Sequence, residues 1–458
     1  MKSQRKLFAF PHAFALMFGI TIFMAILTWI LPAGVYDVDP QTKRVIANSY
    51  HQIAQHPQGL WDIFHAVTKG CAQSAVMMTM VFFIGGAVAV IEETGTISNA
   101  MGSVMNLFKG KEMWATAFIM AFISIVGATG SFANSSIAAV PLGIVLAKSM
   151  GYDSVVGAAL IYLGAYIGFN VGWGNVFTIG IANQIAELPI LEGFGVRVAL
   201  HIINAILTIG FVLMYMRKIK NDPTKSLAYD PDEPAPAVTA SESAKMTGVQ
   251  KICGIVVIIG FGFIVTGALR WKWGISESTT CFFIMSILCG LIGGLGVNGT
   301  CKTFVKGMGK MAYAAYIIGF ARAISVIMTD GKIIHTVVYY LSLPISKVGP
   351  VLGANLMLAA NVIINFFISS GSGQANAVMP LMVPLADLTG ISREVAVQAY
   401  QFGDGFTNCI IPTSGVLMGV LGLIGVSWAK WAKWYLPLLL AQLVVAVITI
   451  TAMQMYAM

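Results

Sequence analysis

Apolar runs long enough to cross a membrane recur along the whole chain, and they constrain its fold more than any other feature. A helix needs about 20 mostly apolar residues to span a bilayer. Runs of this kind occupy residues 12–32, 70–92, 154–187, 196–216, 251–270, 278–296, 303–329, 394–428 and 433–455. Only 10% of the residues are charged, whereas a soluble domain carries roughly 25%. The sequence therefore predicts an all-α, polytopic membrane protein.

Two further apolar segments, 112–148 and 348–387, are interrupted at their centres by Gly, Ser and Asn. Each interruption contains Gly-Ser followed by Ala-Asn, which ends at Asn134 and at Asn376, and a Pro-Leu motif follows in an apolar run. The arms on either side are too short to cross about 30 Å of hydrocarbon comfortably at about 1.5 Å per residue. We therefore expect two re-entrant hairpins that turn at mid-depth near these asparagines.

An apolar helix that breaks again follows each hairpin, at 168–175 and at 403–415. A polar, proline-rich stretch at 217–250 favours a cytoplasmic loop between two repeats, 1–216 and 251–458. The predicted parts are helices within 12–92, a hairpin at 112–148, a broken helix at 154–187 and a helix at 196–216, and then helices within 251–329, a hairpin at 348–387, a broken helix at 394–428 and a helix at 433–455. One extra span after the linker inverts the second repeat, and inverted repeats with broken helices are typical of secondary transporters.

Positive charges at the ends of the apolar runs indicate the orientation. With the N-terminus in the cytoplasm, most of the 27 Lys and Arg residues lie on the cytoplasmic side, as the positive-inside rule requires. The first run is longer than the apolar core of a secretory signal, so we expect a retained helix in a bacterial inner membrane, surrounded by lipid. The net charge of +8 follows from this topology. The sequence contains no basic cluster interleaved with aromatic residues, which is the pattern that would indicate nucleic-acid binding.

Neutral polar residues at the breaks indicate a binding site at mid-membrane, where irregular backbone survives only if it is buried in protein or lines a wet cavity. Ser, Thr and Asn supply donors and acceptors, helix N-termini attract carboxylates, and opposing carbonyls bind Na⁺. The candidates at the hairpin tips and the second break are Ser131, Asn134, Ser372, Asn376, Asn408 and Thr413. Asn175 is the candidate at the first break.

Asp404, in the second break, and Arg322, in the span at 303–329, are charged residues that lie within the predicted spans. Ionisable residues are costly inside a membrane and are usually functional, so Asp404 is a candidate for binding substrate or ion, with Arg322 as its candidate charge partner. The sequence contains no phosphate-binding P-loop, nucleophile elbow or zinc-protease motif. We therefore expect no enzymatic activity and no cofactor, and an energy source in a Na⁺ or H⁺ gradient or in substrate exchange.

Four stretches of the chain are similar to a known family. They run from Thr28 to Gly34, from Pro141 to Asp153, from Asn175 to Thr178 with Ile181-Ala182, and from Gln401 to Gly415. Through them the chain resembles the anaerobic four-carbon-dicarboxylate carrier (DcuC-like) family, in particular its YfcC-type branch of amino-acid or carboxylate transporters within the ion transporter superfamily. The resemblance extends over essentially the whole chain, and the last stretch is the most specific.

The resemblance implies an elevator-type carrier, in which a dimeric scaffold domain holds a moving transport domain made of hairpins and broken helices. It also implies that polar residues at the hairpin tips bind the substrate carboxylate and Na⁺. The matching residues are Ser131, Asn134, Ser135, Ser372 and Asn376, with Na⁺ expected at Asn134 and Asn376. Asn175 and Thr178 lie in the third matching stretch and are further candidates for the site. Members carry Thr after the tip asparagine, whereas this chain has Ser135 and Ala377 there, which leaves the coupling ion open.

The favoured substrate is a small metabolite with a carboxylate, either an amino acid or a dicarboxylate, moved by symport or exchange. A basic amino acid, exchanged as arginine for ornithine, is the alternative, with Asp404 as its acidic partner. If Asp404 instead pairs with Arg322 or carries the coupling proton, a simple carboxylate is favoured. A channel is a weaker alternative, because it would need rings of charge or carbonyls across subunits.

Overall fold

The computed structural model describes residues 13–37, 46, 49–97, 99, 110–130, 132–133, 135–175, 177–189, 192–229, 246–271 and 273–458. These residues are mostly helical and include two short antiparallel strands, β1 (Gly34–Val35) and β2 (His51–Gln52). Six of the described helices are long and apolar enough to cross a membrane by length and composition. They are Ala75–Glu93, Phe194–Asn221, Ile275–Ile292, Ala312–Asp330, Pro350–Phe367 and Trp428–Ala457.

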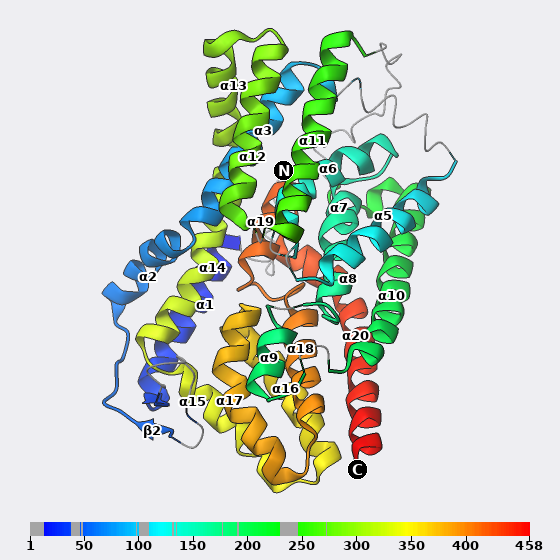
Figure 1. The fold of residues 1–458 in the computed structure, drawn as a ribbon. Coiled ribbons are helices and arrows are strands. Elements are labelled where there is room, and N and C mark those ends of the chain that lie inside the picture. Colours follow the sequence, from blue (N-terminus) through cyan, green and yellow to red (C-terminus); the bar gives the residue numbers. More distant parts are fainter. Residues whose placement is uncertain are drawn as a thin grey trace, which may run out of the picture.

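One group of helices forms a wall along one side of the molecule (Figure 1). It comprises α1 (Ala13–Ile30), α2 (Leu60–Gln73), α3 (Ala75–Glu93), α11 (Gly248–Arg270), α12 (Ile275–Ile292), α13 (Gly296–Lys310) and α14 (Ala312–Asp330). In this wall α2 packs along α14, and α3 packs along α12 and α13. The predicted spans at 70–92 and 303–329 correspond to α3 and α14, but both were predicted to start too early. Ser74 separates α2 from α3, and Met311 separates α13 from α14. Apolar content alone gives no signal for these bends.

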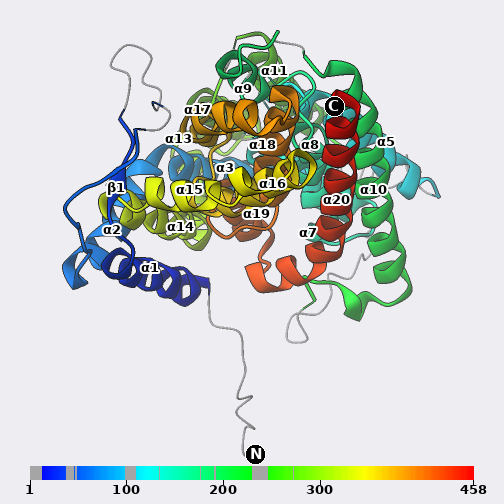
Figure 2. The same cartoon turned by 90° about the horizontal axis from the view of Figure 1, so that it is seen from below.

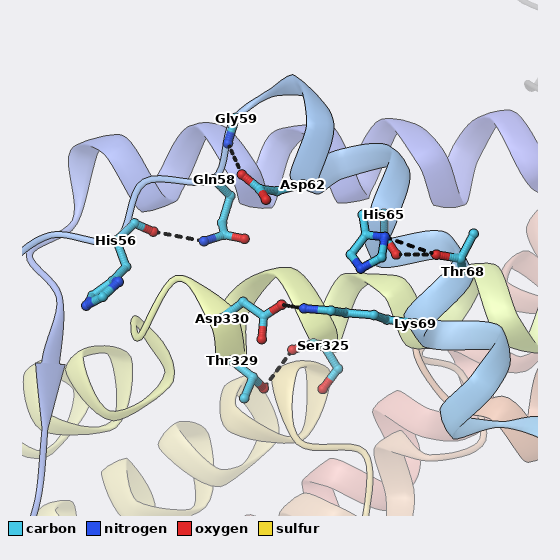
Figure 3. A network of polar contacts seen from close by, with 10 residues as sticks. All are labelled: His56, Gln58, Gly59, Asp62, His65, Thr68, Lys69, Ser325, Thr329 and Asp330. Atoms are coloured by element: carbon cyan, nitrogen blue, oxygen red, sulfur yellow. Dashed lines mark hydrogen bonds and ion pairs between the residues drawn. The ribbon is translucent and has the colours of Figure 1, made fainter.

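Direct backbone contact and an ion pair join α2 to α14. A Cβ built on Gly70 would lie 2.5 Å from the carbonyl oxygen of Gly319, so the two helices touch without intervening side chains. Beyond that contact, Lys69 Nζ lies 2.8 Å from Asp330 Oδ2, as Figure 3 shows. The wall therefore presents one closely packed helix pair to the rest of the molecule.

The second group contains two helical hairpins and two broken helices. In chain order these are α5 (Glu112–Gly127), α6 (Ser136–Ser149), α7 (Ser154–Ala158), a π-helical turn (Ala159–Leu163), α8 (Gly164–Phe169), α9 (Ile179–Ile185), α10 (Phe194–Asn221), α15 (Ile334–Ser342), α16 (Pro350–Phe367), α17 (Gly371–Thr389), α18 (Arg393–Thr407), α19 (Gly415–Ile424) and α20 (Trp428–Ala457). In the view of Figure 2, α1 and α2 lie at one side, α10 and α20 lie at the other, and α16 and α18 lie between them.

The two broken helices pack in a reciprocal way. In the first, α7 packs on α6 and α8 on α5, whereas α9 crosses to α17. In the second, α18 packs on α16 and α17, whereas α19 crosses to α6 and α14. Figure 1 accordingly shows α6 and α7 in the upper half of the molecule and α9, α16, α17 and α18 in the lower half. Both helix breaks therefore lie where the two halves meet.

Short polar residues and glycines set the ends of these helices. The Ser370 side chain accepts from Gly373 N at the start of α17, and Ser414 accepts from Leu417 N at the start of α19. Gly390 and Gly425 end the same helices with φ of 70° and 69°, a left-handed conformation that glycine adopts without a Cβ penalty. These caps fix where each half-helix begins, and so they fix the positions of the breaks.

Two predicted boundaries differ from the structure. The second hairpin turns at 368–370, between α16 and α17, whereas Asn376 lies inside α17. Helix α10 continues to Asn221, past the predicted linker start at 217, because its last turn retains helical hydrogen bonds despite its charge. Residues 230–245 of the linker lie outside the described residues.

Arg393, at the start of α18, joins the ends of α9 and α17. Its Nε and Nη2 lie 2.9 and 2.8 Å from the two carboxylate oxygens of Asp387, and its Nη1 lies 2.9 Å from Glu187 Oε2. Paired contacts of this geometry are the stronger kind of surface ion pair, worth on the order of 1 kcal/mol when partly exposed.

We expect Arg393→Gln to lower the melting temperature of the protein in detergent, because it breaks these contacts. The control Arg217→Gln, on an exposed face of α10, should leave the melting temperature unchanged. Equal melting temperatures for the two variants would show that Arg393 does not stabilise the ends of α9 and α17.

Candidate functional site

A cavity of about 620 Å³ lies where the hairpins and broken helices meet the wall. Its lining comes from both hairpin connections, both helix breaks, the α2–α3 junction, the middle of α14 and the start of α12. The polar lining residues include Gln73, Ser74, Ser135, Thr178, Arg322, Ser369, Ser370, Ser372, Asn408, Thr413 and Ser414. The cavity is therefore bounded by the segments that the sequence predicts to interrupt the membrane helices.

Several candidates predicted from the sequence line this cavity. They are Ser135, Thr178, Arg322, Ser372, Asn408 and Thr413. The outermost of them, Ser135 and Thr413, are 278 residues apart in the sequence (413 − 135), and the structure brings the whole set to one surface. Ser131 and Asn134, at the first tip, lie outside the described residues.

Two asparagines from the predicted set do not line the cavity. Asn175 is buried and its Oδ1 accepts from Phe177 N at 3.0 Å and from Thr178 N at 3.2 Å, so it holds the first break in shape. Asn376 lies on an exposed face of α17 and donates to Ser372 O at 2.8 Å. Its side chain is therefore engaged within its own helix.

Asp404 is completely buried, one turn before the end of α18. The glycines on either side allow close packing: a Cβ on Gly403 would lie 2.5 Å from Asn361 Cβ, and one on Gly405 would lie 2.6 Å from Asn170 Cα. Oδ1 of Asp404 accepts from Asn408 Nδ2 at 3.3 Å, and Oδ2 has no hydrogen-bond partner among the described residues. The carboxyl therefore lies between the second hairpin and the first break.

Sequence reasoning missed the buried amides that hold the broken helices. Asn365 Nδ2 donates to Asp404 O, to Thr407 Oγ1 at 2.7 Å and to Asn408 Oδ1. Gln401 Nε2 donates to Phe169 O at 2.7 Å, at the point where α8 ends and the first break begins. The available signal was an amide side chain inside an otherwise apolar run, since such a group must find a partner when it is buried.

Arg322 is the only charged side chain among the described residues that line the cavity. It is exposed to the cavity, and its Nε donates to Gln73 Oε1 at 3.0 Å. No ion pair joins it to Asp404 within the described residues, so the expectation that these two residues pair is not met. Its remaining guanidinium donors are available to an anion in the cavity.

Two helix N-termini add to this positive charge. Gly371 and Ser372 begin α17, Gly415 and Val416 begin α19, and all four line the cavity. The first N–H groups of a helix lack partners within the helix and carry partial positive charge. Together with Arg322 they make the cavity suited to a carboxylate.

The sequence analysis also missed a buried arginine. Arg197, near the start of α10, is 1% exposed, and its Nε donates to Gln398 Oε1 at 2.8 Å. It therefore ties α10 to α18 away from the cavity. Among the described residues, no three His, Cys, Asp or Glu side chains cluster as metal ligands.

A family model described as DcuC, C4-dicarboxylate anaerobic carrier, matches residues 10–455. The chain belongs to this family. Membership in the DcuC family places it among multi-pass membrane transporters rather than enzymes, in agreement with the resemblance seen in the sequence.

Two curated relatives cover nearly the whole chain. The chain is 29% identical over 455 residues to an Escherichia coli (strain K12) protein named "Putative basic amino acid antiporter YfcC", which covers 90% of each chain. It is 26% identical over 468 residues to an uncharacterised Haemophilus influenzae protein, covering 91% of each. The match to the crystal structure of the Alcanivorax borkumensis YdaH transporter covers 96% of this DcuC-family chain and 98% of the YdaH chain, with 18% identity and a TM-score of 0.38.

Proposed function

We propose that the protein is a secondary transporter that moves a small carboxylate-bearing metabolite across the bacterial inner membrane. The observation that carries the proposal is the cavity of about 620 Å³ in which Arg322 is the only charged described side chain. Ligand sites of this size hold small metabolites. An arginine and two helix N-termini favour a carboxylate, because both supply directed N–H donors and positive charge.

A dicarboxylate fits this lining better than a basic amino acid. A cationic side chain would need an acidic group in the cavity, and the described lining contains none. Asp404 lies beside the lining residue Gly371, but it is buried. The name of the Escherichia coli relative and the unpaired Asp404 Oδ2 keep basic amino-acid exchange as the second candidate.

The reciprocal packing of the broken helices supports two repeats of opposite orientation, 1–216 and 251–458, joined by the cytoplasmic linker. The hairpins, broken helices, α10 and α20 would form the transport domain of an elevator. The wall of α1–α3 and α11–α14 would form the scaffold. A cavity bounded by both groups supports this division, because sliding one group along the other would move the site across the membrane.

Three further parts of the proposal rest on the sequence. The N-terminus lies in the cytoplasm according to the distribution of Lys and Arg, and the scaffold forms a homodimer according to the family resemblance. Na⁺ or H⁺ supplies the driving force, with Asn134 and Asn376 as the predicted Na⁺ ligands. The exposed position of Asn376 in α17 gives that residue less support than Asn134.

Counterflow in proteoliposomes tests the proposal. Vesicles preloaded with unlabelled succinate should accumulate external labelled succinate transiently, because a carrier returns its binding site with substrate bound. Arginine and ornithine, tested in the same way, examine the second candidate. A flux that does not saturate and shows no stimulation by internal substrate would indicate a channel and contradict the proposal.

A further inference from the structure

One helix end faces both the cavity and Asp404. Gly371 is the first residue of α17, a helix of 19 residues, and both Gly371 and Ser372 line the cavity. A Cβ built on Gly371 would lie only 3.0 Å from Asp404 Oδ2. The partial positive charge at the start of α17 is therefore close both to the Asp404 carboxyl and to any anion in the cavity.

Among the described residues, no cation lies beside the Asp404 carboxyl. It is 0% exposed, and its Oδ2 lacks a hydrogen-bond partner within the part of the chain that is described. Its one side-chain hydrogen bond comes from Asn408 at 3.3 Å. Burial of a charge is costly unless the charge is paired and hydrogen-bonded, so this site disfavours a permanent anion.

The helices packed against α18 bring no charged group to Asp404. The titratable side chains that face it are the phenols of Tyr400 on α18 and Tyr166 on α8. α16 contributes Asn365, which donates to the Asp404 carbonyl, and α20 contributes Tyr435, whose hydroxyl donates to Gln442. The first break, before α9, and the start of α17 contribute Thr178 and Gly371, which carry no charge.

An ionised Asp404 and a substrate carboxylate would compete for the same helix end. Two anions near each other in a low-dielectric site repel strongly, and one helix end compensates only about half an elementary charge. A proton on Asp404 removes this repulsion and leaves the start of α17 to the substrate.

From this geometry we propose that Asp404 is the proton-binding site of the transporter and that it must be protonated for the substrate carboxylate to bind. The inference rests on the proposed function, because it needs a carboxylate in the cavity. Coupling of this kind is reciprocal: the bound carboxylate raises the proton affinity of Asp404. Substrate binding therefore takes up a proton, and affinity increases as the pH falls.

Succinate binding to the purified protein between about pH 6 and pH 8 tests this coupling. Uptake of one proton per substrate strengthens binding by at most about tenfold per pH unit. We expect this dependence in the wild type and in the control Asp222→Asn, which alters a partly exposed carboxylate that follows α10 and pairs with Lys225. Asp404→Asn should bind succinate with an affinity that does not change with pH, because the amide resembles the protonated acid.

Proton uptake by the wild type gives a second measurement that needs no variant. In weakly buffered solution, each succinate bound should remove about one proton. The inference would be overturned if Asp404→Asn bound succinate with the same pH dependence as the wild type. It would also be overturned if this variant bound no succinate at any pH. Wild-type affinity that follows Na⁺ and not pH would overturn it as well. No succinate binding by the wild type at any pH would instead contradict the proposed substrate class, and the inference would fail with it.

Discussion

Arg322→Gln should abolish succinate uptake while the protein still folds. The substitution removes the only charged side chain in the described lining of the cavity and leaves a neutral amide in its place. In the proposed complex, bound succinate would cover the exposed Arg322 guanidinium and form a charge pair with it. Removing one partner of such a covered, hydrogen-bonded pair costs about 2–5 kcal/mol, so affinity should fall by at least about 30-fold. Equilibrium binding of succinate and initial uptake rates in proteoliposomes measure this loss.

The same helix pair supplies a matched control. Arg322 and Gln73 join α14 to α2 beside the cavity, and Lys69 and Asp330 join the same two helices farther along (Figure 3). Lys69→Gln breaks a contact between α2 and α14 without altering the cavity lining, so it should change uptake little. Similar losses in both variants would assign Arg322 a role in helix packing, and normal affinity in Arg322→Gln would remove it from the binding site.

The positions of the hairpins could be predicted because their apolar arms are short and their centres are polar. The predicted tip was nevertheless displaced in the second hairpin. The repeated Ala-Asn motif drew attention to Asn376, whereas the chain turns at 368–370 and α17 begins at Gly371. The start of α17 is set by the N-cap at Ser370. Serines also occupy positions 369 and 372, so the sequence alone did not show which of them caps the helix.

The cavity itself could be predicted only in part. Asp404 and Arg322 stood out because charges are rare in membrane spans, but their distance depends on how α18 packs relative to α14. Asn365, Gln401 and Arg197 were overlooked because each is a single polar residue within a helix. Their importance follows from hydrogen bonds between segments distant in sequence, which residue spacing does not reveal.

Gly371→Ala should nearly eliminate uptake, although it favours helix formation. Alanine is about 1 kcal/mol better than glycine in a helix, so the start of α17 is not weakened. The new methyl group, however, would lie 2.6 Å from Thr178 Cγ2 and 3.0 Å from Asp404 Oδ2. Overpacking of this kind costs about 1–3 kcal/mol, and the displacement falls on the helix end shared by the cavity and the carboxyl. Melting temperature and uptake rate, measured on one preparation, separate folding from transport.

A double-variant cycle distinguishes crowding at this point from a general effect of alanine. Thr178→Ser keeps the hydroxyl and removes the methyl group nearest to the new side chain, so combining it with Gly371→Ala should restore part of the uptake. Gly210→Ala, in α10, meets no atom within 4 Å and should transport normally. If Gly371→Ala transports like the wild type with unchanged pH dependence, the start of α17 does not join substrate binding to Asp404. If the effects of Gly371→Ala and Thr178→Ser on the uptake rate are simply additive, the loss of uptake in Gly371→Ala does not arise from crowding against Thr178.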